Sequence, residues 1–151
     1  MKSQRIGTKV LNWNQRFEIV KGVAAGLLYL HEEGVQVVVH RDIKAANVLL
    51  DGDLKNKLSD FGLARLYDHG GNSRTTSVVE TLGYLAPELM KTGKAMTMTD
   101  WALECWKRGM LLQVVDGKLK EDYVEEEVYK VVQLVVLCSH TNPTTRLTIW
   151  Q

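Results

Sequence analysis

Residues 37–51 read VVVHRDIKAANVLLD, and polar residues are concentrated here between two apolar runs, VVV and VLL. Short runs of β-branched and aliphatic residues are typical of buried strands. The segment between them is therefore either a solvated turn or a loop whose polar groups two buried strands hold at a cleft. The five polar side chains in question are His40, Arg41, Asp42, Lys44 and Asn47.

The composition limits the class of protein. The chain has 151 residues, of which 45% are hydrophobic and 25% charged, as is usual for one globular domain or a large part of one. Its 19 basic and 18 acidic residues give a formal net charge of +1. Because nucleic-acid-binding domains usually carry a strong basic excess, we expect no nucleic-acid partner.

Cysteine usage and apolar run length bear on the compartment. Cys105 and Cys138 are far apart and form no CxxC pair, so we expect neither a disulfide framework nor a zinc site. The first residues lack an apolar signal core, and the longest apolar stretch, 131–138, is too short to span a bilayer. These features predict a soluble, cytoplasmic chain with no direct membrane insertion.

Apolar periodicity predicts a mainly helical fold with short β-hairpins. A helix is expected from Trp13 to His31, with Asn12 and Gln15 as a capping box and Gly34 after its end. Within it, two glycines four residues apart share one face and predict close packing (Gly22 and Gly26).

Further elements follow along the chain. Strands are expected at 37–39, 47–50 and 55–59, with an Asp-Gly turn at 51–52, and residues 60–85 are expected to form a long loop. Two later helices are predicted at 101–108 and 123–138, and a last one near Thr148.

Three motifs occur in a fixed order. HRDIKAAN spans 40–47, DFG spans 60–62 and APE spans 86–88. Each tripeptide alone is weak evidence of function, whereas the order and spacing together are strong evidence. In this arrangement the sequence resembles the eukaryotic protein kinases.

The resemblance implies transfer of the ATP γ-phosphate to a protein hydroxyl, a reaction that depends on positioning and charge neutralisation. Asp42 would accept the hydroxyl proton, and Lys44 would contact the transferred phosphate. Asn47 and Asp60 supply hard oxygen ligands for Mg²⁺. Leu49 would form the floor of the adenine pocket. A lysine two residues after the aspartate resembles the serine/threonine-specific branch.

Other residues acquire roles from the same resemblance. His40 and Phe61 would be packing residues, and Arg41 would hold a phosphate on the activation segment, residues 60–88. Thr81 resembles the threonine that shapes the substrate site. Glu88 and Arg146 resemble a buried ion pair. The candidate phosphorylation sites are Ser73, Thr75, Thr76 and Ser77.

Longer segments narrow the resemblance. WNQRFEIVKGVAAGLLYLHEE, VVVHRDIKAANVLLD, FGLARLYDHG and WALECWKRG resemble plant receptor-like kinases of the legume-lectin-domain branch. The resemblance covers the C-terminal lobe, residues 11–151, and leaves 1–10 as the lobe boundary. Complete relatives are plasma-membrane receptors with a cytosolic kinase domain. The implied partners are a protein substrate or a full-length receptor-like kinase, and the implied cofactors are ATP and Mg²⁺.

Four features depart from the family pattern. The chain contains no GxGxxG loop, no VAxK lysine and no glutamate partner for that lysine. Asp100 is followed directly by Trp101, where relatives have a central apolar helix between the two segments. Glu80 stands where relatives usually have glycine, and Gln151 falls early in the last helix. We therefore expect an incomplete kinase-like C-terminal lobe with C-terminal helices over 101–151.

These departures leave the enzyme assignment open. The first expectation is a kinase fragment with little or no activity alone. The alternatives are a non-catalytic binding module, or decoy, for full-length kinases and an abbreviated gene product without function.

Overall fold

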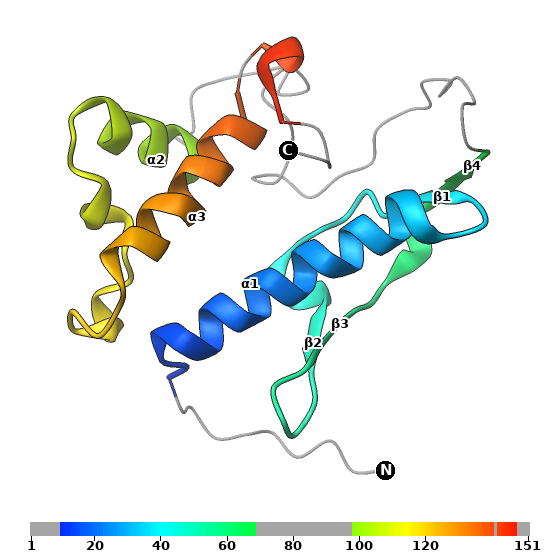
Figure 1. Cartoon of the computed structure of the whole chain (residues 1–151), viewed down its shortest axis with the longest axis horizontal. Helices are drawn as coiled ribbons and strands as arrows, with labels where there is room; N and C mark the ends of the chain where they lie inside the picture. The colour runs from blue at the N-terminus through cyan, green and yellow to red at the C-terminus, as the bar shows by residue number, and fades with distance from the viewer. Residues whose placement is uncertain (1–9, 69–97, 141, 148–151) are drawn as a thin grey trace.

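A computed structural model describes residues 10–68, 98–140 and 142–147 (Figure 1). Within these ranges the α-helices are α1 (Trp13–Leu28), α2 (Met98–Lys107) and α3 (Glu125–Cys138). The strands of the same ranges are β1 (Val37–Val39), β2 (Val48–Leu50), β3 (Asn56–Leu58) and β4 (Arg65–Tyr67). The predicted class, mainly helical with short antiparallel strand pairs, is confirmed.

Helix α1 begins with the predicted capping box. The side chain of Asn12 accepts from the backbone N–H of Gln15 at 3.0 Å, and the Gln15 side chain accepts from the Asn12 N–H at 3.1 Å. The helix passes into a π-helical turn, Tyr29–Glu33, that ends at Gly34. Gly34 has an extended backbone with φ −74° and ψ 162°, so it ends the helix without the left-handed cap that glycine often forms.

Strands β2 and β3 form an antiparallel hairpin, as predicted, with each strand shorter than expected by a residue or two. The carboxylate of Asp51 holds the turn, because its Oδ1 accepts from the N–H groups of Asp53 at 3.0 Å and Lys55 at 2.9 Å. The left-handed residue of the turn is Leu54, with φ 62°. The turn itself lies where the Asp-Gly pair at 51–52 predicted it.

Strand β4 pairs antiparallel with β1, and Val37 lies opposite Tyr67. The prediction of a loop over residues 60–85 is therefore wrong at 65–67, and also at the 3-10 turn Phe61–Leu63. RLY has no periodicity that marks a strand, and it becomes one because β1 offers backbone groups that need partners. Residues 69–85 lie outside the described part of the chain.

The C-terminal helices differ slightly from prediction. α2 already includes Met98–Asp100, so the helix runs continuously through the Asp100–Trp101 junction. α3 starts two residues later than predicted, and its first turn carries three glutamates near the positive helix end. A 3-10 turn follows at Pro143–Thr145. The helix expected near Thr148 falls outside the described residues.

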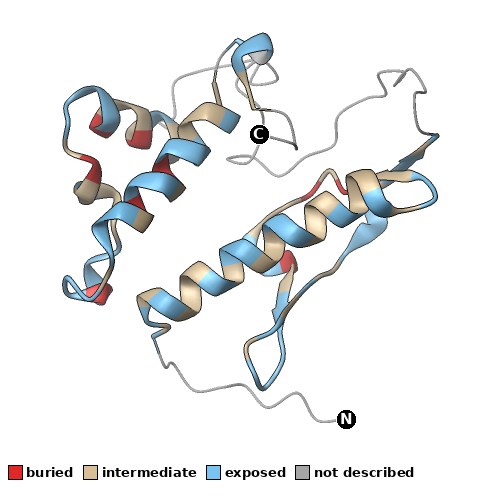
Figure 2. Cartoon of the chain, in the orientation of Figure 1, coloured by how far each residue is buried: buried red, intermediate tan, exposed pale blue. Residues whose placement is uncertain are grey.

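Burial is divided unequally along the chain (Figure 2). No residue of α1 is fully buried. Within the described residues, every buried apolar side chain belongs to the C-terminal part, around α2 and α3, with Trp13 of α1 packed against the cluster. The buried apolar side chains are Ala102, Cys105, Leu111, Leu119, Val128 and Val132.

Two polar contacts join α1 to this apolar core. The indole N–H of Trp13 donates to the carboxylate of Glu127 on α3. Arg16 Nη1 lies 3.0 Å from Asp116 Oδ2. The first turns of α1 are thereby tied to the C-terminal helices, while the rest of the helix lies along the β2–β3 hairpin (Figure 1).

Candidate functional site

The loop between β1 and β2 contains the only buried polar side chains among the described residues. His40 is 1% exposed, Asn47 5% and Asp42 9%. Buried polar groups are costly unless they are hydrogen-bonded, so their partners define this loop. The burial of these side chains argues against the solvated turn. The expectation of two buried flanking strands is wrong, however, because no residue of β1 is fully buried and Leu49 and Leu50 of β2 are exposed.

Two donors converge on the carboxylate of Asp42. Lys44 Nζ donates to Asp42 Oδ2 at 2.6 Å. Asn47 Nδ2 donates to the same oxygen at 3.0 Å and to the backbone oxygen of Asp42 at 2.9 Å. Both donors stabilise the negative charge and fix the orientation of the carboxylate.

His40 connects this loop to the residues before DFG. Its Nε2 lies 3.0 Å from the carbonyl oxygen of Ser59, and its Nδ1 accepts from the N–H of Asp42 at 3.3 Å. Both contacts are satisfied when Nε2 carries the proton and Nδ1 does not. The ring also packs against Phe61, with ring centroids 4.6 Å apart. His40 therefore links the 40–47 loop to the segment before DFG.

The backbone is left-handed at two non-glycine residues of the site. Arg41 has φ 70° and Asp60 has φ 62°. Such conformations cost energy and persist where the surroundings determine them. Next to Asp60, the backbone N–H and the Oγ of Ser59 both donate to the carbonyl oxygen of Asn47 at 2.9 Å. These bonds place the backbone of Asn47 beside that of Ser59–Asp60.

The oxygen atoms of Asn47 and Asp60 are of the chemical type that Mg²⁺ prefers. Because Asn47 Nδ2 is directed at Asp42, the amide oxygen is the atom of Asn47 suited to a metal. Asp60 is exposed and adds a carboxylate. Mg²⁺ is usually held by one or two protein oxygens together with water and phosphate. No group of three or more His, Cys, Asp or Glu in the described residues could hold a metal ion.

The remaining predicted site residues are distributed as follows. Leu49 is 56% exposed and Phe61 43% exposed, and Arg41 is half-buried. Arg146 Nε donates to the carbonyl oxygen of His140 at 2.7 Å. Outside the described residues lie Ser73, Thr75, Thr76, Ser77, Thr81 and Glu88.

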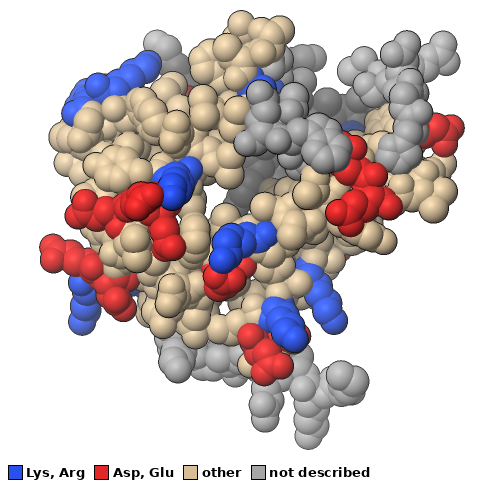
Figure 3. All heavy atoms as spheres, in the orientation of Figure 1, with Lys and Arg blue, Asp and Glu red and all other residues tan. Residues whose placement is uncertain are grey.

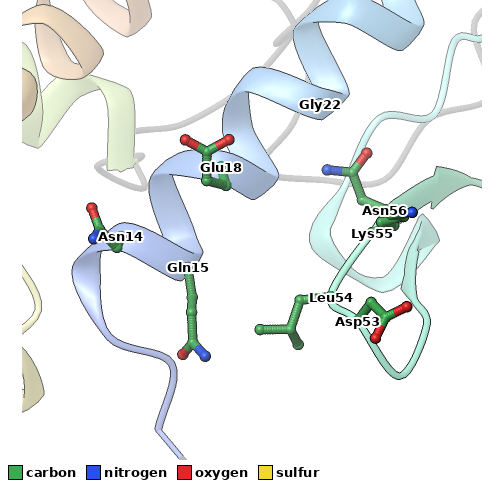
Figure 4. A pocket seen from close by; sticks show the side chains of 8 residues that line it. All are labelled: Asn14, Gln15, Glu18, Gly22, Asp53, Leu54, Lys55 and Asn56. Atoms are coloured by element: carbon green, nitrogen blue, oxygen red, sulfur yellow. The ribbon is translucent and has the colours of Figure 1, made fainter.

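A cleft between α1 and the β2–β3 turn was not predicted from the sequence (Figure 4). Its volume is about 690 Å³, and it includes none of the residues of the 40–47 loop. It forms because the β2–β3 hairpin folds back on α1. This long-range contact cannot be predicted from local sequence patterns. Its lining residues are Asn14, Gln15, Glu18, Gly22, Asp53, Leu54, Lys55 and Asn56.

Charged side chains of both signs lie interspersed on the face drawn in Figure 3. None of the helices in residues 10–68, 98–140 and 142–147 combines the length and the hydropathy of a membrane-spanning segment.

Comparison with known proteins shows the family. The protein kinase domain profile matches residues 3–151. The chain is 47% identical to the L-type lectin-domain containing receptor kinase SIT2 of Oryza sativa subsp. japonica, over 93% of this chain and 25% of that protein. It is 45% identical to the putative L-type lectin-domain containing receptor kinase V.2 of Arabidopsis thaliana, over 91% of this chain and 26% of that protein.

These alignments also bear on the length of the chain. The chain spans about a quarter of the length of the curated relatives it matches. The alignment with the rice kinase has 171 positions, more than the 151 residues of this chain, so that kinase has residues inside the matched region that this chain lacks. The predicted resemblance to legume-lectin receptor-like kinases is confirmed, and the chain belongs to the protein kinase domain family.

Proposed function

We propose that this chain carries the phosphoryl-transfer loop of a serine/threonine protein kinase. The observation that supports this most is the Asp42 carboxylate, which is 9% exposed and held by Lys44 at 2.6 Å and Asn47 at 3.0 Å. A fixed carboxylate next to a lysine suits the orientation and deprotonation of a substrate hydroxyl.

The other roles follow from the same arrangement. Asp42 accepts the hydroxyl proton, and Lys44 contacts the phosphate that is transferred. Asn47 and Asp60 hold Mg²⁺, which when bound neutralises charge on the ATP phosphates. Leu49, exposed on β2, packs beneath the adenine ring.

We also propose the division of the chain that the sequence predicted. Residues 1–10 are a lobe boundary, and 11–151 are a partial kinase domain with C-terminal helices from 101. The activation segment is 60–88, and Arg41 receives its phosphate. Thr81 shapes the substrate site, and Glu88 pairs with Arg146. The phosphorylated residues come from Ser73, Thr75, Thr76 and Ser77.

These 151 residues alone are proposed to transfer little or no phosphate. They contain no GxGxxG loop and no VAxK lysine, the parts that cover and grip ATP phosphates in protein kinases. We place the residues that the alignment shows to be lacking at the Asp100–Trp101 junction, which lies inside α2. A large loss of buried contacts there would also reduce stability.

A second candidate function is a cytoplasmic binding module for a full-length receptor-like kinase or a protein substrate. It is favoured by large apolar side chains that are exposed in the segments after the 40–47 loop: Leu49 at 56%, Phe61 at 43% and Leu66 at 64%. Large exposed apolar areas often mark interaction surfaces. Co-purification of a receptor-like kinase with the chain, lost when Leu49 and Leu66 become serine, supports this function over the first.

The test is thermal unfolding with and without Mg-ATP. A ligand that binds only the folded state raises the unfolding midpoint. We expect a rise for the unaltered chain and none for Asp60→Ala. A cooperative transition without a rise favours the binding module, and the absence of a cooperative transition contradicts both functions. Phosphorylation by the isolated chain that disappears in Asp42→Asn would overturn the proposed inactivity.

A further inference from the structure

Helix α1 and strand β3 approach closely where α1 has its two glycines. A Cβ added at Gly22 would overlap the side-chain amide of Asn56, and one added at Gly26 would lie 3.7 Å from Leu58 Cδ1. Four residues of helix advance about 6 Å and two residues of strand about 6.7 Å. The glycine pair on the helix therefore matches alternate residues on one face of the strand.

The contact at Gly22 is polar and specific. Asn56 Nδ2 donates to the backbone oxygen of Ile19, one turn earlier in α1, at 2.8 Å. Figure 4 shows the Asn56 side chain on the strand beside the helix at Gly22. Without a Cβ at Gly22, the amide can reach the helix backbone, so the hydrogen bond and the glycine depend on each other.

This contact lies on the hairpin that carries both proposed magnesium ligands. Asn47 comes immediately before β2, and Asp60 comes two residues after the end of β3. Ser59 closes the base of the hairpin through its two hydrogen bonds to the Asn47 carbonyl. A shift of β3 on α1 therefore moves both ligands.

We propose that Asn56 and Gly22 are positioning residues for the magnesium–nucleotide site. They fix the β2–β3 hairpin on α1 and thereby set the orientation of Asn47 and Asp60. The inference rests on the proposed function, and it adds residues that contact neither substrate nor metal.

A double-mutant cycle tests the contact. Gly22→Ala in the unaltered chain displaces the Asn56 amide and should lower the unfolding midpoint by about 3 °C, and Asn56→Ala should lower it similarly. In the Asn56→Ala background the same Gly22→Ala change should raise the midpoint, because alanine is the better helix former. Gly26→Ala is the matched control and should not lower the midpoint in either background. An equal effect of Gly22→Ala in both backgrounds overturns the contact.

Magnesium-dependent binding tests the positioning role. Calorimetry measures the affinity for ADP with and without Mg²⁺, at a temperature where each variant is folded. Asn56→Ala should reduce the gain in affinity due to Mg²⁺ about tenfold, as changes behind metal ligands do. A merely structural role would leave the affinity of folded molecules unchanged, and that result overturns the inference.

The two proposals fail in distinguishable ways. If the unaltered chain binds Mg-ADP and Asn56→Ala binds it equally well, the positioning role is wrong and the proposed function stands. If the unaltered chain shows no magnesium-dependent binding, the proposed function is wrong and the positioning role is lost with it. The sign change in the double-mutant cycle would then identify a packing contact only.

Discussion

The β1–β2 loop and the α2–α3 region bury side chains of opposite kinds. The loop buries His40, Asp42 and Asn47, which are linked by hydrogen bonds. The α2–α3 region buries apolar side chains, with Val128 at 2% exposure. Neither region contains a fully buried residue of the other kind among the described residues.

The two kinds of burial contribute differently to the stability of the fold and to the orientation of its side chains. Apolar burial is non-directional and supplies most of the favourable free energy of folding. A buried hydrogen-bonded cluster contributes less net free energy, but each partner has a required direction. We expect the α2–α3 region to determine whether the chain folds and the polar loop to determine how its carboxylate is presented.

The largest effect should come from the apolar core. Leu111→Ala removes a side chain that is 6% exposed and leaves a cavity, which should lower the free energy of unfolding by about 2–5 kcal/mol. Urea denaturation measures the change. Leu134→Ala on α3, where the leucine is 44% exposed, is the matched control and should cost clearly less. Equal losses would show that the α2–α3 cluster is not the core.

The polar loop should show a smaller loss of stability and a larger loss of ligand response. Asn47→Ala leaves the Asp42 oxygens without two hydrogen bonds, at a cost of about 1–3 kcal/mol. It should also abolish the rise in unfolding midpoint with Mg-ATP. Asn14→Ala, an exposed asparagine on α1, should change neither quantity. A persistent rise in Asn47→Ala would contradict the proposed metal role.

The contact between α1 and the α2–α3 region should matter less again. Trp13→Phe keeps an aromatic ring against the core and removes the N–H that donates to Glu127, at a cost of about 1–2 kcal/mol. Glu127→Gln should lower the free energy of unfolding less in the Trp13→Phe background than in the unaltered chain. Denaturant unfolding of the unaltered chain, the two single variants and the double variant measures this coupling. Trp106→Phe, at a tryptophan that is 37% exposed, is the control. Additive losses would mean that this hydrogen bond does not couple α1 to α3.

The smallest expected effect is a change in stability at acidic pH. The backbone N–H of Lys118 and then the Arg16 side chain hold the pKa of Asp116 below its ordinary value of 3.8. A carboxyl with a lowered pKa stabilises the fold above the unfolded-state pKa, and this contribution disappears as pH falls through the folded-state value. The difference in unfolding midpoint between the unaltered chain and Asp116→Asn should therefore shrink below about pH 4. A difference that stays constant with pH would exclude this linkage.

Local patterns predicted much of the fold. The capping box of Asn12 and Gln15, strand β1 and the end of α3 lie where periodicity and end signals placed them. Strand β4 was missed because its strand character comes from pairing with β1, about 30 residues away in sequence. The left-handed conformation of Leu54 in the β2–β3 turn was not predicted, because a leucine has no local preference for it.

The candidate site, like the fold, could be predicted from the sequence only in part. The order and spacing of HRDIKAAN, DFG and APE identified the family and named Asp42, Lys44, Asn47 and Asp60. Periodicity also predicted close packing at Gly22 and Gly26, and β3 packs there. That Asn56 is the residue opposite Gly22 could not be predicted, because it depends on the register of a hairpin folded onto a helix.

Motif spacing and apolar periodicity are properties of neighbouring residues, so the sequence was enough to predict the candidate site residues and most of the local elements, strand β4 excepted. The tertiary structure alone decided which groups meet: His40 with Ser59, Asn56 with Ile19, and Trp13 with Glu127. These pairs are 19, 37 and 114 residues apart. Contacts at such separations are set by how whole elements pack, and that packing depends on the sum of many weak interactions over the chain.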